Sequence, residues 1–283
     1  MADNRQQLAE QAKKVPFSVQ ISSTGYQNLI NRTLRDKGTA DRFVAAITST
    51  VSANPALQEC ECSTILSAAL LGESLKLSSS PQLGQYYLVP FKDRKNNRTV
   101  ATFVLGYKGY IQLAVRSGQY KKLNVLPIKA GELIDYDPLE EEIRVNLIQD
   151  DREREKAETI GYYAFFEYIN GFKKALYWTK EKMVAHAEKY SAGYQAHKGY
   201  TFWEKDFDGM ACKTMLRQLI SKWGIMSIDL QKADEGDNAM IGMDGTPVYV
   251  NTPPQEPQTI IPQDEPPIDS IPAEAVEINL NDL

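Results

Sequence analysis

The stretch TIGYYAFFEYINGFKKALYWT, residues 159–179, gives the clearest indication of local structure in this sequence. Aromatic and other apolar residues fill two runs of strand length, and Asn170 and Gly171 lie between them. The Asn-Gly pair favours a type I′ turn, whose twist matches that of two antiparallel strands. The stretch therefore predicts a β-hairpin within an antiparallel sheet.

Similar patterns precede this hairpin. The runs GQYYLVPF and RTVATFVLG enclose the polar segment KDRKNNR, which is typical of a second hairpin with a basic tip. Further strand-like runs occupy residues 121–137 and 140–148, whereas residues 108–117, 180–190 and 202–223 have apolar residues at helical spacing. Hairpins with helices before, between and after them predict an α+β fold, with a largely antiparallel sheet and flanking helices.

The charges are divided unevenly along the chain. Residues 234–283 contain eleven Asp and Glu and neither Lys nor Arg, so residues 1–233 hold all 32 Lys and Arg and the other 26 acidic residues, a balance of +6. Eight of the fourteen prolines also follow residue 234. We therefore expect a basic folded body and a disordered acidic tail.

Basic residues recur on two of the predicted helices. Lys108, Gln112 and Arg116 are spaced by four residues, as are Lys213 and Arg217, so each set shares one helix face. Further cations are Lys121, Lys122 and the hairpin-tip residues Lys92, Arg94, Lys95 and Arg98. Cations beside aromatic segments suit a single-stranded nucleic acid, and we expect the two helices to line one trough. Ordinary solvated helix faces are the alternative interpretation.

Signatures of enzymes are largely missing from the sequence. It has no G-x-x-x-x-G-K-[ST] phosphate loop, only two histidines, and three cysteines without a spacing typical of zinc sites. The acidic residues Asp135, Asp137, Glu140, Glu141 and Glu142 leave open a Mg²⁺-dependent nuclease. A self-assembling structural protein indifferent to nucleic acid is a third hypothesis.

Nothing in the sequence indicates a membrane or the secretory route. The start MADNRQQLAEQAKK is polar, and the apolar runs are too short for a membrane span. An odd number of cysteines fits a reducing compartment. We therefore expect a cytosolic protein.

Three blocks in order, LGESLKLSSSPQLGQYYLVPFKD, TFVLGYKGYIQLAVRSGQY and FWEKDFDGMACKTMLRQLISKW, resemble the RecT family of phage and prophage recombinases. The resemblance covers roughly residues 40–232. It implies a non-enzymatic, ATP-independent protein that binds single-stranded DNA, anneals complementary strands in homologous recombination and assembles into oligomers or helical filaments. It also implies a Rad52-like annealing core, in which a twisted antiparallel sheet with helices lines a DNA groove.

The resemblance carries further expectations about partners. The protein would act on DNA ends resected by a 5′→3′ exonuclease in the cytosol of a bacterial host, with the annealed duplex as an intermediate. A host single-strand-binding protein is a further candidate partner. No cofactor would be required, and Mg²⁺ would at most modulate DNA binding.

Matching motif positions extend the set of candidate residues. The L-G-Y-[KR]-G block supplies Tyr107, Lys108 and Gly109, the R-S-G-Q block supplies residues 116–119, and the third block supplies Trp203, Glu204, Lys213, Thr214 and Arg217. Where relatives often have a G-L-E-P-G-like turn, this chain has KLSSSP, so backbone contacts do not carry over there. The predicted DNA contacts are Tyr107, Lys108, Gly109, Gln112, Arg116, Lys121, Lys122, Lys92, Arg94, Trp203, Lys205, Lys213 and Arg217.

The predicted organisation has three parts. Residues 1–39 form a helical segment for oligomerisation, residues 40–233 form the DNA-binding annealing core, and residues 234–283 form the disordered acidic, proline-rich tail.

Overall fold

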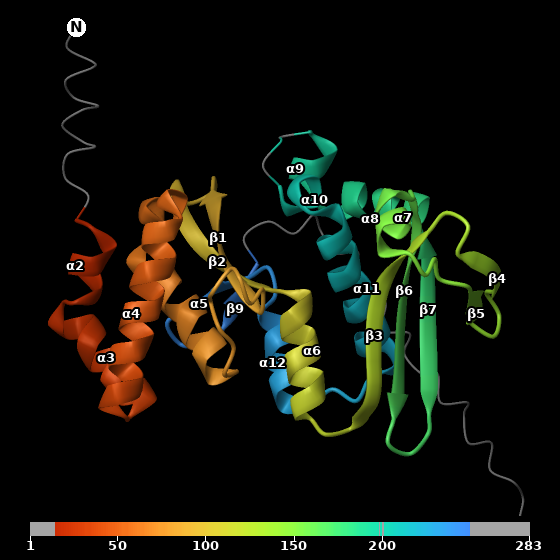
Figure 1. Ribbon diagram of the computed structural model, residues 1–283. Helices are drawn as coiled ribbons and strands as arrows, with labels where there is room; N and C mark the ends of the chain where they lie inside the picture. Colours follow the sequence, from red (N-terminus) through yellow and green to blue (C-terminus); the bar gives the residue numbers. More distant parts are fainter. Residues whose placement is uncertain (1–14, 198, 200, 250–283) are drawn as a thin grey trace, which may run out of the picture. The chain divides into compact units, whose positions relative to one another are not determined.

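The computed structural model describes residues 15–197, 199 and 201–249 (Figure 1). Its N-terminal part is helical and contains α2 (Phe17–Ile21), α3 (Thr24–Leu34), α4 (Lys37–Ala53), the 3-10 helix η1 (Pro55–Glu59) and α5 (Cys62–Ser74). Asp36 caps α4, because its carboxylate accepts a 2.7 Å hydrogen bond from the Thr39 amide. The predicted division after residue 39 therefore falls inside a continuous helix.

The hairpin with the basic tip is confirmed. Strands β1 (Tyr86–Asp93) and β2 (Arg98–Leu105) pair antiparallel, with Tyr86 opposite Leu105 and Asp93 opposite Arg98. Helix α6 (Tyr107–Arg116) follows, one residue from the predicted bounds. Tyr110, Leu113 and Ala114 bury one side of α6 against the body, whereas Lys108, Val115 and Arg116 are exposed.

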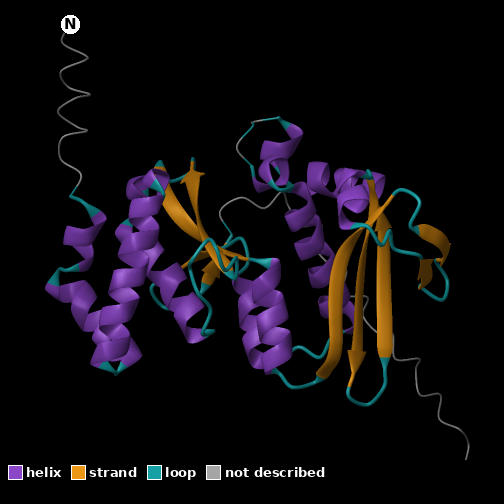
Figure 2. Cartoon of the chain, viewed as in Figure 1, coloured by secondary structure: helices purple, strands orange, loops and turns teal. Residues whose placement is uncertain are grey.

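The aromatic stretch forms the centre of a three-stranded antiparallel sheet. Its strands are β3 (Tyr120–Lys129), β6 (Thr159–Tyr168) and β7 (Lys173–Thr179), in the order β3-β6-β7 (Figure 2). Between β3 and β6 the chain forms β4 (Leu133–Asp137), β5 (Glu142–Val145) and α7 (Asp151–Lys156). Tyr162, Ala164, Phe166 and Tyr168 are buried, and their alternation in β6 shows that one face of this sheet is packed.

The turn of this hairpin differs from the predicted type I′ turn. The Gly171 amide donates to the Tyr168 carbonyl, and the Tyr168 amide donates to the Phe172 carbonyl. Gly171 has φ +87°, whereas Asn170 has a negative φ. A type I′ turn needs positive φ at both central residues, so the loop is a type I turn followed by a glycine bulge. The loop between the two strands therefore has one residue more than the two-residue turn that the sequence predicts.

The predicted helix over residues 202–223 is interrupted. After α8 (Lys180–Tyr190) and α9 (Ala192–Gln195), the structure has α10 (Phe202–Lys205) and α11 (Phe207–Trp223). Asp206 separates them, because its side chain accepts a hydrogen bond from the Gly209 amide and caps α11. An N-cap residue has non-helical backbone angles, so the chain changes direction there.

Helix α11 contributes to two apolar cores. Leu216 and Ile220 pack with the N-terminal helices, β1, β2 and α6, whereas Met215 and Leu219 pack with the β6 aromatics and α8. Figure 1 shows α11 between these two groups of elements. A helix buried on several sides leaves few of its side chains for solvent.

The body continues beyond residue 233. Helix α12 (Ile228–Gly236) and the short strands β8 (Met240–Ile241) and β9 (Pro247–Val248) follow α11. Ala239 pairs with Phe103 of β2, and Ala233, Asp237 and Ile241 are buried. The predicted start of the tail at residue 234 is therefore wrong, and the rest of that prediction, residues 250–283, lies outside the described residues.

This boundary changes the charge balance of the body. Asp234, Glu235, Asp237 and Asp244 join the 26 acidic residues of the first 233, against 32 Lys and Arg, which leaves a balance of +2 for residues 1–249. The net charge of the body is therefore a weak indication of a polyanion partner, and the individual cations decide the question.

The α+β class with antiparallel strands and flanking helices is confirmed. Within the described residues the strands form four separate sheets, rather than one. No helix in this part of the chain is both long enough and apolar enough to cross a membrane.

Candidate nucleic-acid interface

The predicted trough between α6 and α11 is not open to a ligand at Lys213. The Lys213 side chain is 7% exposed, and its Nζ lies 2.8 Å from Asp237 Oδ1. A buried ammonium with a buried carboxylate partner is not accessible to a DNA phosphate. The prediction for Lys213 is therefore wrong, because it assumed that residues after 233 leave this face of α11 uncovered.

Asp237 is the centre of a buried polar network. Besides Lys213, its Oδ1 accepts a 2.8 Å hydrogen bond from the Leu105 amide at the end of β2. Arg217 lies 3.4 Å from Asp237 Oδ2 and 2.9 Å from Asp234 Oδ1. The Tyr110 hydroxyl of α6 donates to Asp234 at 2.7 Å. The network joins β2, α6, α11 and α12, so Arg217 also serves the fold.

The three polar residues of α6 have different environments. Lys108 is exposed, and Gln112 is half-buried. Arg116 is exposed, but its guanidinium donates to the carbonyls of Leu75 and Lys76, both at 2.8 Å. These carbonyls lie directly after the last residue of α5, where the backbone carbonyls need external donors. Arg116 therefore ties α6 to α5.

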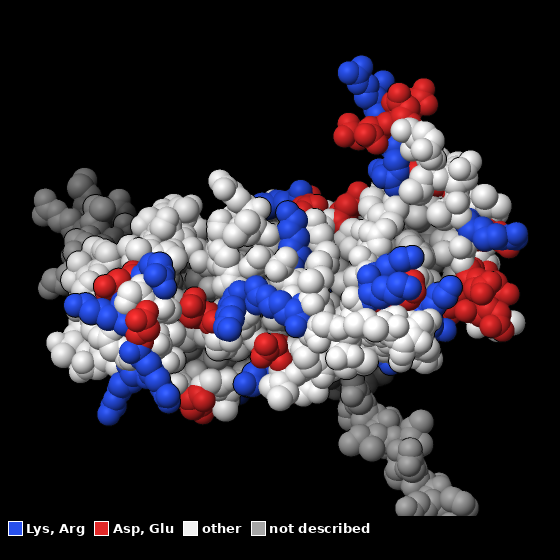
Figure 3. Space-filling model, turned by 60° about the horizontal axis from the view of Figure 1, so that its bottom comes forward, with Lys and Arg blue, Asp and Glu red and all other residues white. Residues whose placement is uncertain are grey.

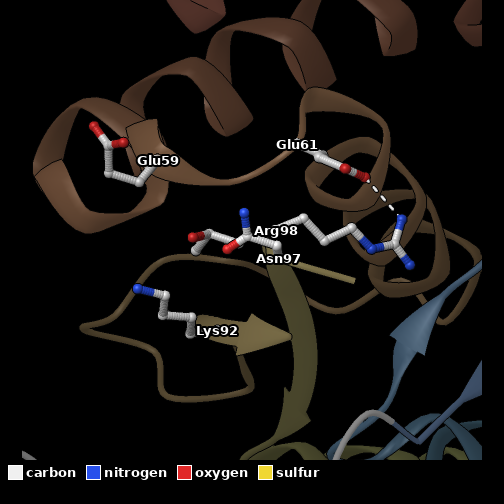
Figure 4. A pocket seen from close by; sticks show the side chains of 6 residues that line it. Glu59, Glu61, Lys92, Asn97 and Arg98 are labelled. Atoms are coloured by element: carbon white, nitrogen blue, oxygen red, sulfur yellow. Dashed lines mark hydrogen bonds and ion pairs between the residues drawn. The ribbon is translucent and has the colours of Figure 1, made fainter. Parts of the chain in front are cut away.

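Two cations of the β1–β2 tip, Lys92 and Arg98, lie near acidic groups. Lys92 and Arg98 line a pocket that is also lined by Glu59 and Glu61 (Figure 4). Arg98 bonds Glu61 Oε2 at 3.1 Å and Asp93 Oδ2 at 3.2 Å. Lys92 and Arg94 are exposed, and their contact with DNA stays a prediction.

Lys121 and Lys122 on β3 share one acidic partner. Their ammonium groups lie 2.6 Å and 3.4 Å from the carboxylate of Glu167 on the neighbouring strand β6. Both lysines remain largely exposed. A phosphate here would compete with Glu167, which weakens the case for this pair.

Two motif residues have packing roles. Trp203 is 7% exposed and contacts Tyr194 and Phe207 in the second core, so it is not a surface for base stacking. At Gly109 a Cβ atom would lie 2.2 Å from the Gln85 carbonyl oxygen. Only glycine lets α6 approach the chain before β1 so closely.

The remaining predicted residues belong to the start of α6 and to α10. Tyr107 is half-buried, Lys108 is exposed, and Lys205 is exposed at the end of α10. Neither lysine has an ion-pair partner among residues 15–197, 199 and 201–249. Two further rings lie here: Tyr87 of β1 and Phe202 of α10 are 5.6 Å apart between centroids. We name these residues the aromatic–cationic surface: Tyr87, Tyr107, Lys108, Phe202 and Lys205.

The tyrosines of this surface stay neutral. Burial raises the pKa of the Tyr87 hydroxyl, and the nearby Asp206 carboxylate raises this pKa further. Burial also raises the pKa of Tyr107, with Cys212 and Asp206 as further causes. Because both pKa values lie above the ordinary value of 10.0, both hydroxyls can donate hydrogen bonds to a phosphate at neutral pH.

Sequence reasoning missed Tyr87 and Phe202. The sequence does contain a pattern that indicates the position of Phe202, because Thr201 and Glu204 form a capping box that sets the start of α10. With the helix start known, the two adjacent rings must point in different directions, Trp203 inward and Phe202 outward. Tyr87 follows from strand alternation, because its neighbours Tyr86 and Leu88 are buried.

The carboxylates of the nuclease hypothesis do not converge. Asp135 pairs with Arg144 at 2.7 Å, and Glu141 pairs with Lys174 at 2.7 Å. Asp137 accepts hydrogen bonds from the amides of residues 139 and 140 in the turn after β4. Among the described residues, no group of three or more His, Cys, Asp and Glu is arranged to hold a metal ion.

Lys and Arg are interleaved with Asp and Glu on the face shown in Figure 3. This mixture agrees with the many local ion pairs above. A cation without an ion-pair partner among the described residues is therefore more informative than the density of cations, and this favours Lys108 and Lys205.

Comparison with known proteins gives consistent matches. The sequence profile of the RecT family matches residues 41–249, and so includes Asp237. The Bacillus subtilis (strain 168) protein named "Uncharacterized protein YqaK" is 42% identical over 194 residues, which are 69% of this chain and 63% of that protein. Protein RecT of Escherichia coli (strain K12) is 30% identical over 198 residues, 69% of this chain and 70% of that protein. The match thus spans less than two thirds of the Bacillus subtilis relative.

Proposed function

The chain belongs to the RecT family, and from this premise we propose that it binds single-stranded DNA and anneals complementary strands in homologous recombination without hydrolysing ATP. The observation that carries the proposal is the family match over residues 41–249, which runs from α4 to the end of the described residues. The aromatic–cationic surface supports it, because cations and partly exposed rings are what a single strand needs.

The chemistry of annealing needs no hydrolytic site. Cations that bind phosphates carry no sequence information, so any strand is held with its base edges free. Lys108 and Lys205 provide two such cations, and the Tyr107 hydroxyl provides a donor. Base pairing between two held strands then supplies both the specificity and the free energy.

Assembly is part of the proposal. The aromatic–cationic surface of one subunit contains two cations, so a long strand requires many subunits side by side, as an oligomer or a helical filament. Residues 1–39 are the proposed oligomerisation segment, and its continuity with α4 would connect neighbouring subunits to the core. The proposed substrate is an end resected by a 5′→3′ exonuclease, with a host single-strand-binding protein as a further partner.

The test is annealing of two complementary labelled oligonucleotides by the full chain without ATP. We expect duplex formation to be faster than the spontaneous reaction and to be unchanged by added ATP. A rate equal to that of the oligonucleotides alone, at protein concentrations that saturate them, would contradict the proposal.

The same reaction with Mg²⁺ separates the alternatives. If the strands shorten with the unsubstituted chain but stay intact with the Asp135→Asn and Asp137→Asn variants, the nuclease hypothesis is favoured. Assembly of the chain without any retention of DNA would favour the structural protein. We expect intact strands and retained DNA.

A further inference from the structure

We propose that Tyr87 and Phe202 form a stacking platform for unpaired nucleobases. This proposal deepens the proposed function and rests on it, since it names the part of single-stranded DNA that the aromatic–cationic surface recognises. The ligand is a flat, unpaired base of a strand whose phosphates lie near Lys108 and Lys205.

The two rings are close enough to act together. Their centroids are 5.6 Å apart with an angle of 39° between the ring planes, and Phe202 is 41% exposed. Exposure of a large apolar ring to water is unfavourable in free energy, and a base that stacks on the ring removes this exposure. The exposed side of the Phe202 ring is therefore open to a ligand.

Phe202 is held in place by its helix start. Thr201 Oγ1 accepts from the Glu204 amide, while Glu204 accepts from the amides of Gly199 and Thr201 at 2.8 Å and 3.0 Å. This capping box fixes the direction in which the chain enters α10. Little side-chain entropy is then lost when a base stacks on the ring.

Tyr87 is supported by two glycines. A Cβ atom at Gly106 would lie 3.2 Å from Tyr87 Cε2, and one at Gly84 would lie 3.0 Å from the Tyr87 hydroxyl oxygen. The tyrosine therefore lies directly against glycine backbone. Any larger residue at these positions would push it from its place beside Phe202.

Lys108 lies beside Tyr87, and Lys205 lies on the same short helix as Phe202. A Cβ atom at Gly84 would also lie 3.5 Å from Lys108 Cδ, so the Lys108 stem passes beside the Tyr87 hydroxyl. Lys205 follows Phe202 by three residues, which places both on one side of α10. Asp206 is the carboxylate that raises the pKa of Tyr87, and its side chain accepts a hydrogen bond at the N-terminus of α11.

Two other exposed rings, Trp223 and Tyr190, already have lysine ammonium groups over them. Trp223 has the ammonium groups of Lys174 and Lys222 over its ring, 4.7 Å and 4.9 Å from the centroid. Tyr190 lies against His186, with Lys189 over its ring. A base would have to displace these cations. Tyr87 and Phe202 have no such cation among the described residues.

Stacking on the rings uses the face of a base and leaves its pairing edge free, whereas in a continuous duplex the neighbouring base pairs cover both faces of each base. The platform therefore prefers an unpaired strand, and pairing with a complement removes the base from the rings. This gives a physical reason for release of the annealed product.

The test compares a thymidine oligonucleotide with an abasic oligonucleotide of the same length, measured by fluorescence anisotropy. Phe202→Leu should weaken binding of the thymidine strand by about 5- to 150-fold, the range expected for one lost stacked base. Its binding of the abasic strand should stay within about twofold of the unsubstituted chain. Phe202→Tyr should restore thymidine binding, and thermal unfolding of each variant checks the fold.

Equal weakening of both strands by Phe202→Leu, or no weakening of either, would overturn the platform while leaving the proposed function intact. Failure of the unsubstituted chain to bind either strand would overturn both. Lys108→Glu serves as the reference, because it should weaken both strands alike.

Discussion

Asp237 shows how one buried residue can determine the role of its neighbours. Its carboxylate pairs with Lys213, contacts Arg217 and accepts the Leu105 amide, and its side chain is fully buried. Lys213 and Arg217 have the spacing expected for a solvent-facing basic stripe, yet both point towards acids that come later in the chain. Charged groups pair when they are buried, and no spacing rule on α11 alone can reveal the partner.

Asp237→Asn should reduce the free energy of unfolding by about 3–5 kcal/mol, because it leaves the Lys213 ammonium buried without a charged partner. Chemical denaturation measures the loss. Lys213→Met in the same chain should recover part of the stability, since it removes the unpaired charge. A change below about 1 kcal/mol for Asp237→Asn would contradict a buried ion pair.

At the scale of elements, the sequence predicts what local patterns control. Both hairpins, α6 and α8 lie where alternation, helical spacing and the Thr179 cap place them. The Asp206 break was missed, because the apolar spacing of residues 202–223 continues across it. The separate sheets were also missed, since strand pairing between distant segments depends on packing that local patterns do not contain.

The segment from β3 to α7 offers a pH-dependent test at Glu132, whose side chain is fully buried. Burial opposes its ionisation, but hydrogen bonds from Arg154 and from the amides of Lys129 and Ile148 outweigh burial and hold its pKa below the ordinary 4.5. A lowered pKa gives stability that is present above about pH 4.5 and is lost as the pH falls through the folded-state pKa.

Glu132→Gln should therefore cost about 1.5–3 kcal/mol at pH 7, the usual value for hydrogen bonds to a charged group. The difference from the unsubstituted chain should shrink as the pH falls below 4.5. Urea unfolding at several pH values gives both numbers. A difference that is constant across this range would mean that the carboxylate is not ionised in the folded chain.

For the whole molecule, the division between body and tail was the least predictable feature. Composition changes at residue 234, where basic residues stop, but the fold continues to residue 249. Ala239 and Ile241 enter the first core, and Asp237 neutralises a buried lysine. The predicted trough also assumed that the fold ends before residue 234, so one misplaced boundary accounts for the main error in the candidate site.

Two truncations test this boundary. A chain ending at residue 250 keeps α12, β8 and β9, so its melting temperature should be close to that of the full chain. A chain ending at Lys232 loses Asp234 and Asp237 and should unfold at a much lower temperature or fail to fold. Equal melting temperatures for the two would show that residues 233–250 contribute nothing to the stability of the fold.

The most direct test of the account is the affinity for a single strand as salt is varied. Lys108→Glu with Lys205→Glu should weaken binding about tenfold or more at low salt for every sequence, and should reduce the log–log salt slope by about 1.4, or 0.7 per phosphate contact. The control is Lys156→Glu with Lys232→Glu, which makes the same charge change at exposed sites outside the predicted contacts. It should have less than about a threefold effect. Equal losses in the two double variants would mean that overall charge, rather than the aromatic–cationic surface, holds the DNA.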